Sequence, residues 1–447
     1  MKKLIFPTAI ALSLLAGGVW ADDATVSTTI QSVSDAEANY QRGEDYYFGQ
    51  NGVKQDYTQA KYWFEKAANQ GHAKAQFGLG LMYDKGNGVQ QNYHTAKQWY
   101  EKAAAQGDAN AQSNLGVMYD NGRGVRQDYH TAKQWYEKAA AQGNANAQYN
   151  LGVMYENGEG VQQNYHTAKQ WYEKAAAQGN ASAQSNLGGL YYDGYGVRQD
   201  YHTAKQWYEK AAAQGNANAQ YNLGVMYTNG QGVRQDYYAA KQWYEKAAAQ
   251  GNANAQYNLG VMYTNGQGVR QDYYAAKQWY EKSAAQGNAI AQYNLGGLYY
   301  NGYGVQQNYH TAKQWYEKAA AQGNAKAQYN LGSLYHNGRG VQKNYHTAKQ
   351  WYEKAAVQGF ADAQLNLGYL YYNGYGVRQD YATAKQWYEK AAAQGDAKAQ
   401  SNLGVMYENG QGVRQSYTIA KSWYGKACDN GDQDGCDAYK RLKQMGY

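Results

Sequence analysis

Apolar residues follow a helical period in two short blocks that recur eleven times along the chain. In residues 145–180 the first block places Ala147, Leu151 and Met154 at positions i, i+4 and i+7. That spacing puts apolar side chains on one face of a helix. A second block around Trp171 shows the same period. The pattern therefore predicts two amphipathic helices, and no strands, in each copy.

Residues that favour helix starts and stops bracket both blocks. Asn144 precedes the first block and is a good N-cap, and Gly158 follows it, because glycine tolerates the left-handed conformation in which helices often end. The second block is preceded in every copy by another good N-cap residue, and it is followed by a glycine from Gly71 to Gly431. These eleven cap residues are Asp56, Asn92, Asp128, Asn164, Asp200, Asp236, Asp272, Asn308, Asn344, Asp380 and Ser416.

One tryptophan in each copy sets the register of the repeats. The series, with a constant spacing of 36, is Trp63, Trp99, Trp135, Trp171, Trp207, Trp243, Trp279, Trp315, Trp351, Trp387 and Trp423. One helix pair cannot bury its own apolar faces, whereas stacked pairs can, so the pattern predicts an all-α solenoid. The helical spacing places the tryptophans in the core and disfavours an exposed stacking platform. We also expect the tryptophan helix to pack closely against the mid-helix Gly152 and its equivalents.

The chain is expected to divide into four segments. Residues 1–21 have a basic start, an apolar run and a small-residue cut site after Ala21, which is typical of a signal peptide. The run is short for a membrane anchor, so an exported chain without a membrane span is expected, in the periplasm, secreted or at the cell surface. Residues 22–35 are predicted to be an unstructured polar leader, 36–432 eleven repeats of about 36 residues, and 433–447 a C-terminal capping helix.

Composition agrees with the copying of one unit. The chain has 51 Tyr and 52 Gly but 5 Phe and 1 Pro. Repeats 217–252 and 253–288 differ only in Ala247 against Ser283, which indicates a recent duplication. The net charge of +7 is mild, and its Lys, Arg, Asp and Glu are interspersed. This charge pattern predicts a solvated surface and no nucleic-acid partner.

Three motifs recur in the copies: Ala-x-Ala-Gln-x-x-Leu-Gly-x-x-Tyr in the first helix, a Gly-x-Gly-Val loop, and Ala-Lys-x-Trp-Tyr-x-Lys-Ala-Ala-x-x-Gly in the second. The unit closely resembles the Sel1-like repeat, a relative of the tetratricopeptide repeat, over nearly all of residues 36–440. The resemblance implies a right-handed superhelical solenoid with a concave face. Family members serve as adaptors and scaffolds, and exported bacterial members are often envelope or host-interaction proteins.

Cys428 and Cys436 are the two cysteines of the chain, and they flank the turn at Gly431. In an oxidising compartment a disulfide is favoured over a free thiol pair or a metal site. Such a bridge would hold the capping helix. The pair also resembles the Cys-x7-Cys pairs of the cysteine-rich branch of the family, in which each pair bridges consecutive units. Here only the last unit carries one.

No motif in the sequence points to catalysis, a metal or a cofactor. Six histidines share one repeat position: His94, His130, His166, His202, His310 and His346. Equivalent positions in stacked repeats lie roughly 10 Å apart, too far for two imidazoles to share a zinc ion, so exposed histidines are expected. Lys169 and Glu173 are expected to form a surface charge pair. Because Ser-x-x-Lys, converging carboxylates and a Ser-His-Asp set are absent, we predict no catalytic residue and no enzyme.

The face of the first helix opposite its apolar stripe varies among repeats, and it would line the concave groove of a tetratricopeptide-like stack. Its predicted partner-binding residues are Tyr149, Tyr192, Tyr221, Tyr257, Tyr293, Tyr300, Tyr329 and Tyr372. Tyrosine gives rigid contact area with a hydroxyl for hydrogen bonds, although it is also a solvent-tolerant filler. We predict a non-enzymatic scaffold of the bacterial envelope or cell exterior that recognises, through this Tyr/Asn-rich concave face, a protein or peptide of the envelope or a host, or a glycan. The alternatives are a cell-wall accessory, which binds peptidoglycan or regulates its enzymes, and a penicillin-recognising hydrolase similar to β-lactamases.

Overall fold

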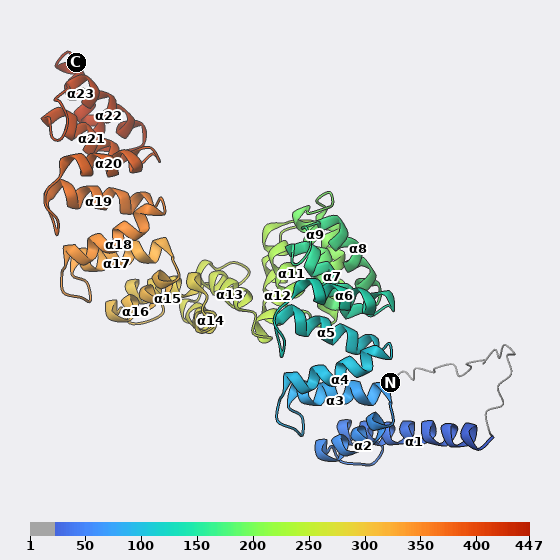
Figure 1. The fold of residues 1–447 in the computed structure, drawn as a ribbon. Coiled ribbons are helices and arrows are strands. Elements are labelled where there is room, and N and C mark those ends of the chain that lie inside the picture. Colours follow the sequence, from blue (N-terminus) through green and yellow to red (C-terminus); the bar gives the residue numbers. More distant parts are fainter. Residues whose placement is uncertain (1–22) are drawn as a thin grey trace. The chain divides into compact units, whose positions relative to one another are not determined.

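A computed structural model describes residues 23–447, and the elements of this part of the chain are α-helices (Figure 1). The described residues form 23 helices and no strand, which confirms the predicted all-α class. The predicted signal peptide, residues 1–21, lies outside the described residues. The chain divides into two units, of which one ends at Gln199 and the other is Asp200–Tyr447.

Each repeat contributes an odd-numbered first helix and an even-numbered second helix. The helices of the first unit are α1 Asp23–Phe48, α2 Tyr57–Asn69, α3 Ala73–Lys85, α4 Tyr93–Ala105, α5 Ala109–Asn121, α6 Tyr129–Ala141, α7 Ala145–Asn157, α8 Tyr165–Ala177 and α9 Ala181–Asp193. Those of the second unit are α10 Tyr201–Ala213, α11 Ala217–Asn229, α12 Tyr237–Ala249, α13 Ala253–Asn265, α14 Tyr273–Ala285, α15 Ala289–Asn301, α16 Tyr309–Ala321, α17 Ala325–Asn337, α18 Tyr345–Val357, α19 Ala361–Asn373, α20 Tyr381–Ala392, α21 Ala397–Asn409, α22 Tyr417–Asp429 and α23 Gln433–Gln444.

The helix ends lie where the cap residues predicted them. Asn144 accepts a hydrogen bond from the Ala147 N–H at the start of α7, and Gly158 ends that helix with φ of 77°. All eleven predicted caps of the second helices accept hydrogen bonds from backbone N–H groups of the first turn. The caps satisfy donors that have no partner inside the helix.

Small and large apolar residues alternate in the core of each repeat. Leu151 on α7 and Ala168 on α8 are fully buried, and Met154 is 1% exposed. The apolar stripe predicted for the first helix is therefore confirmed. Within each unit, each helix packs against the helices before and after it in the chain, as α17 to α23 show in Figure 1.

The aromatic residue after each tryptophan, which is Phe64 in the first repeat and tyrosine in the other ten, is the large buried ring, and this corrects the prediction for Gly152. A Cβ on Gly152 would lie 2.4 Å from the ring of Tyr172, so the close approach is made by this tyrosine and not by the tryptophan. Tyr172 is fully buried, whereas Trp171 is half-buried. Both residues fall on the apolar side of α8, and the helix packed against it selects Tyr172 as the innermost ring.

The tryptophan row was predicted to lie in the core, and it lies at the edge of the core instead. Trp171 packs against the cluster that contains Leu151 and Tyr136. The ammonium of Lys174 lies 4.1 Å from the centroid of its ring. In ten repeats the equivalent lysine lies 4.0–4.3 Å from its tryptophan. A cation over an indole face is favourable, so lysine shields the outer side of the row.

A ladder of buried glutamines, which the sequence pattern did not predict, links successive helices. Gln148 is 6% exposed, and its Nε2 donates to the carbonyl of Ala140 on α6 at 3.3 Å. Its Oε1 accepts from the Nε2 of Gln178, after α8, at 2.8 Å. A buried amide must be satisfied, and these bonds satisfy it with partners from the helices on either side. The same pair of contacts recurs in other repeats of both units.

The N-terminal helix corrects a further expectation. The sequence predicts an unstructured leader over residues 22–35, but α1 begins at Asp23. No glycine or proline occurs between Asp23 and Arg42, so nothing in this stretch interrupts the backbone hydrogen bonds of the first repeat's helix.

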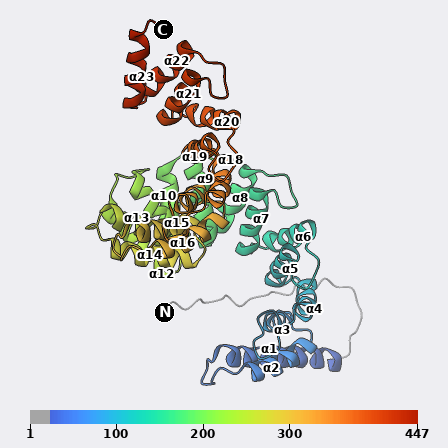
Figure 2. The same cartoon turned by 90° about the vertical axis from the view of Figure 1, so that its left-hand side faces the viewer.

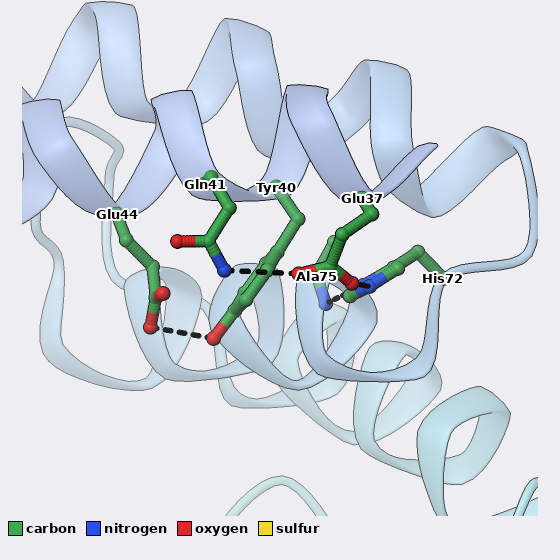
Figure 3. A network of polar contacts seen from close by, with 6 residues as sticks. All are labelled: Glu37, Tyr40, Gln41, Glu44, His72 and Ala75. Carbon is green, nitrogen blue, oxygen red and sulfur yellow. Dashed lines mark hydrogen bonds and ion pairs between the residues drawn. The ribbon is translucent and has the colours of Figure 1, made fainter. Parts of the chain in front are cut away.

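A polar network joins the first two repeats (Figure 3). His72 caps α3: its Nδ1 accepts from the Ala75 N–H at 3.2 Å, and its Nε2 lies 3.0 Å from an oxygen of Glu37. Because Nδ1 accepts, Nε2 carries the proton and donates to the carboxylate. The ring of Tyr40 stacks on the imidazole at 4.6 Å, and its hydroxyl donates to Glu44 at 2.5 Å. This network replaces the Asn–Asn contacts that later repeats use at the same level, such as that between the side chains of residues 144 and 110.

The C-terminal helix α23 covers the last repeat (Figure 2). A disulfide joins Cys428 at the end of α22 to Cys436 in α23. Leu442 is fully buried, and Arg441 forms an ion pair of 2.7 Å with Glu408 on α21. Among the helices of residues 23–447, none is long and apolar enough to cross a membrane.

Candidate partner-binding face

The predicted tyrosines all lie on first helices and are half-buried. We call the surface formed by the positions equivalent to Asn146, Tyr149, Val153 and Glu156 the first-helix face. Five of the tyrosines occupy the position of Tyr149, namely Tyr149, Tyr221, Tyr257, Tyr293 and Tyr329. Their ring centroids lie 5.7–6.0 Å from those of the buried tyrosines of the second helices. Burial raises the pKa of each of the five. One side of each ring is therefore part of the core.

The other three predicted tyrosines, Tyr192, Tyr300 and Tyr372, occupy the position of Glu156. The rings of Tyr300 and Tyr372 meet the first tyrosine of the following helix edge-on at 5.2 Å. The hydroxyl of Tyr300 accepts from Arg339, and that of Tyr372 donates to Gln411 at 2.5 Å. The hydrogen bonds link one repeat to the next. These tyrosines therefore stabilise the stacking of repeats and also form part of the first-helix face.

A recurring asparagine at the position of Asn150 belongs to the same face, which the sequence predicts to be rich in Tyr and Asn without singling out this position. Asn186 donates to the hydroxyl of Tyr172 at 3.0 Å, and the same hydroxyl bonds the carboxylate of Glu156. Its equivalents are Asn114, Asn150, Asn222, Asn258, Asn294, Asn330, Asn366 and Asn402. Asparagine is a poor residue for a helix interior, so its recurrence there was the signal for a side-chain role.

The second unit has a groove of about 800 Å³ over α17, α19, α21 and α23. Tyr329, Leu365 and Ser401, three residues at the position of Tyr149, line it together with His336 and Tyr369. The groove therefore lies on the first-helix face. Of the eight predicted tyrosines, Tyr329 lines it.

Carboxylates dominate the charge of this groove. Asp362, Asp396, Asp432 and Asp434 line it beside the ammonium of Lys398. Within residues 23–447 none of the four carboxylates forms an ion pair. Burial, followed by the nearby Asp396, raises the pKa of Asp362. Neutral residues occupy most of these positions in the middle repeats, so the groove differs in charge from the rest of the face.

Other candidate residues lie elsewhere. The six histidines are exposed, as predicted. Lys169 and Glu173 form the expected surface pair at 2.6 Å. In the part of the chain that the structure describes, no group of three or more His, Cys, Asp or Glu side chains could hold a metal ion.

The fold and this face define a tetratricopeptide-like repeat solenoid. The chain belongs to the Sel1 repeat family. The matched repeats are residues 36–72, 73–108, 109–144, 145–180, 181–216, 217–252, 253–288, 289–324, 325–360, 361–396 and 397–432. Sel1 repeats commonly act as protein-interaction modules, and the family is a non-catalytic scaffold.

Two solved structures agree with this assignment. The first is a protective antigen present in uropathogenic Escherichia coli strains and displaying an SLR fold. It is 39% identical with a TM-score of 0.77, covering 96% of this chain and 91% of its own. The second is a Sel1 repeat protein from Oxalobacter formigenes, 33% identical with a TM-score of 0.52, covering 71% of this chain and 91% of its own. No curated protein matches the chain.

Proposed function

We propose that this chain is a non-enzymatic scaffold of the bacterial envelope or cell exterior that binds a protein or peptide through its first-helix face. The observation that carries the proposal is the contrast between core and face. The core positions of Leu151 and Tyr172 hardly change from repeat to repeat, whereas the face positions of Tyr149 and Glu156 do. Surface residues that vary on a constant repeat scaffold can match an irregular partner surface.

The half-buried tyrosines are suited to this role. Each ring is held on one side by a buried tyrosine, as Tyr221 is by Tyr244 at 6.0 Å. Such a ring loses little conformational entropy when a partner covers its other side. The neighbouring asparagine adds an amide that can bond a peptide backbone.

Three observations support export. The first 21 residues have the composition of a signal peptide, and the disulfide between Cys428 and Cys436 suits an oxidising compartment. The Escherichia coli neighbour is described as a protective antigen. Cell fractionation of the expressing bacterium, with intact-mass analysis of the chain, tests the compartment and the cleavage after Ala21.

A triple variant tests the face. Tyr221, Tyr257 and Tyr293 are replaced by Ser, which the equivalent positions 113 and 185 carry naturally within folded repeats. The chain is used to capture partners from envelope extract and from host secretions, and the dissociation constant of the purified partner is then measured by calorimetry. We expect the variant to bind about tenfold or more weakly, because the few interface residues whose truncation costs more than about 1 kcal/mol are enriched in tyrosine.

The matched control replaces two tyrosines of the second helices, Tyr238 and Tyr274, which are 64% and 61% exposed. His occupies their position in six other repeats, so Tyr238→His and Tyr274→His keep a natural composition. The control should bind as the wild type does, and circular dichroism should show the same helicity for all three proteins. Unchanged affinity in the Ser variant would overturn the assignment of the face.

A further inference from the structure

We infer that the groove over α17, α19, α21 and α23 binds an extended peptide segment rich in arginine or lysine. This inference rests on the proposed function, because it assigns a ligand class to one part of the first-helix face. The groove is a hollow of about 800 Å³, the size range of sites that enclose a ligand. Its lining comes from four successive first helices, so an occupant would run across them.

The net charge of the groove favours a basic ligand. Four carboxylates face one ammonium, that of Lys398, which leaves an excess of three negative charges. Burial, with a contribution from Lys343, lowers the pKa of His336, so its imidazole is neutral at pH 7 and offsets none of them. A basic segment would be attracted to this groove, and an acidic one would be repelled.

The carboxylates keep free acceptor capacity. Asp396 caps α21 through one oxygen, which accepts from the Ala399 N–H at 2.8 Å, and Asp432 caps α23 by a bond of 3.0 Å from Gly435. A carboxylate has about four lone-pair sites, so each cap still has room to accept from a guanidinium. The caps also hold the two side chains in place, which reduces the entropy lost when a ligand binds.

A carboxylate of the same face with a cation partner shows the contrast. Glu408 accepts from the hydroxyl of Tyr424 at 2.8 Å and forms an ion pair with Arg441 at 2.7 Å. None of the four groove carboxylates forms such an ion pair with a residue of 23–447, although the helices around them are formed and capped.

Aromatic walls suit the planar head of arginine. Tyr369 is 40% exposed, and its ring stacks on His336 at 6.0 Å with an interplanar angle of 29°. Tyr329 lines the groove from α17 and is held by Phe360 at 5.3 Å. Guanidinium groups stack well on such rings. Three steps of roughly 10 Å between neighbouring helices correspond to about nine extended residues.

The test uses fluorescent peptides of about this length, built from Gly and Ser and carrying three Arg, three Glu or three additional Ser. Binding to the full chain is measured by anisotropy at low and high salt. We expect the Arg peptide to bind about tenfold or more tightly than the Ser peptide, the Glu peptide not to bind, and salt to reduce the difference.

A quadruple variant then locates the site: Asp362→Asn, Asp396→Asn, Asp432→Asn and Asp434→Asn. Asn occupies these positions in middle repeats, as Asn144 and Asn146 do, so the caps and the fold are retained. The variant should lose about tenfold in affinity for the Arg peptide. The control makes the same charge change at caps of second helices: Asp200→Asn, Asp236→Asn, Asp272→Asn and Asp380→Asn. It should bind as the wild type does.

An Arg peptide that binds no better than the Ser peptide, or equally well to both quadruple variants, would overturn the inference. The outcome is separable from that of the tyrosine test. If the Arg peptide fails while the Ser variant at Tyr221, Tyr257 and Tyr293 still loses its partner, the proposed function stands without the basic ligand. If the Arg peptide binds as expected while the Ser variant keeps its affinity for the partner, the basic-peptide groove is supported and the role of the three tyrosines is refuted.

Discussion

At the scale of single residues, the distance between the two helices of a repeat depends on a glycine and the tyrosine that faces it. In the repeat 289–324 a Cβ on Gly296 would lie 2.7 Å from two ring atoms of Tyr316. That ring is 1% exposed and packs within a cluster of buried residues. A mid-helix glycine costs about 1 kcal/mol against alanine, so its recurrence reflects this packing.

Two neighbouring glycines of α15 give a matched test. We expect Gly296→Ala to lower the free energy of unfolding by about 1–3 kcal/mol, because the added methyl group overpacks the core. Gly297→Ala should be neutral or stabilising by up to about 1 kcal/mol, because the nearest atom to its Cβ is the Tyr316 hydroxyl at 4.0 Å. Chemical denaturation measures both. Equal effects would refute the role assigned to the Tyr316 contact.

At the scale of elements, helix α23 covers the last of the eleven repeats as a single helix, whereas a helix pair covers each earlier repeat. Helix α23 offers Leu442 to the core, and Arg441 to Glu408. Its outer side carries exposed polar residues such as Lys440 and Lys443, as a helix that ends a stack requires. The disulfide ties this cap to α22 across the turn at Gly431.

Removal of the bridge tests its contribution. Closing so short a loop restricts the unfolded chain, so replacing Cys428 and Cys436 by Ser should cost about 2–3 kcal/mol. We expect the loss to be local: hydrogen exchange should become faster in α22 and α23 and stay unchanged in α13. Intact mass with and without reductant establishes whether the bridge forms in protein exported to the periplasm. Free thiols in that protein would contradict the structure.

At the scale of the whole molecule, stability is spread along the chain. The buried glutamines bond helices next to their own, as Gln256 does with Ala248 and Gln286 at 3.2 and 2.8 Å. Contacts of this kind recur from repeat to repeat, so removing one repeat should allow its neighbours to meet through the same contacts.

Deletion of residues 253–288 tests this. Helix α15 would then meet α11 and α12, whose sequences equal those of α13 and α14 except for Ala247 in place of Ser283. The shortened chain should fold with unchanged mean residue ellipticity. Its m-value, the slope of the unfolding free energy against denaturant concentration, should fall by about a tenth, because less surface is exposed on unfolding. Deletion of 433–447, which uncovers the last repeat, should instead cause fraying or aggregation. Loss of helicity in the first variant would contradict nearest-neighbour stability.

The sequence predicted the helices better than it predicted the surface. Caps such as Asp56 and stops such as Gly71 act within a few residues of themselves, so their effect could be read locally. The register also pointed to the first-helix face, on which the groove lies. The groove's charge was missed because Asp362, Asp396 and Asp432 lie at the starts of three different first helices, α19, α21 and α23, and each alone resembles an ordinary helix-cap or first-turn residue.

By itself, then, the sequence determined the number of repeats, the ends of their helices and the apolar stripe, because these depend on local backbone chemistry and on a period within one helix. Tertiary structure decided which aromatic ring is innermost. Trp171 and Tyr172 share the apolar side of α8, and the absence of a side chain at Gly152 on the neighbouring helix selects the tyrosine. It also decided which polar groups form hydrogen bonds and ion pairs between repeats, because these contacts depend on how the helices stack.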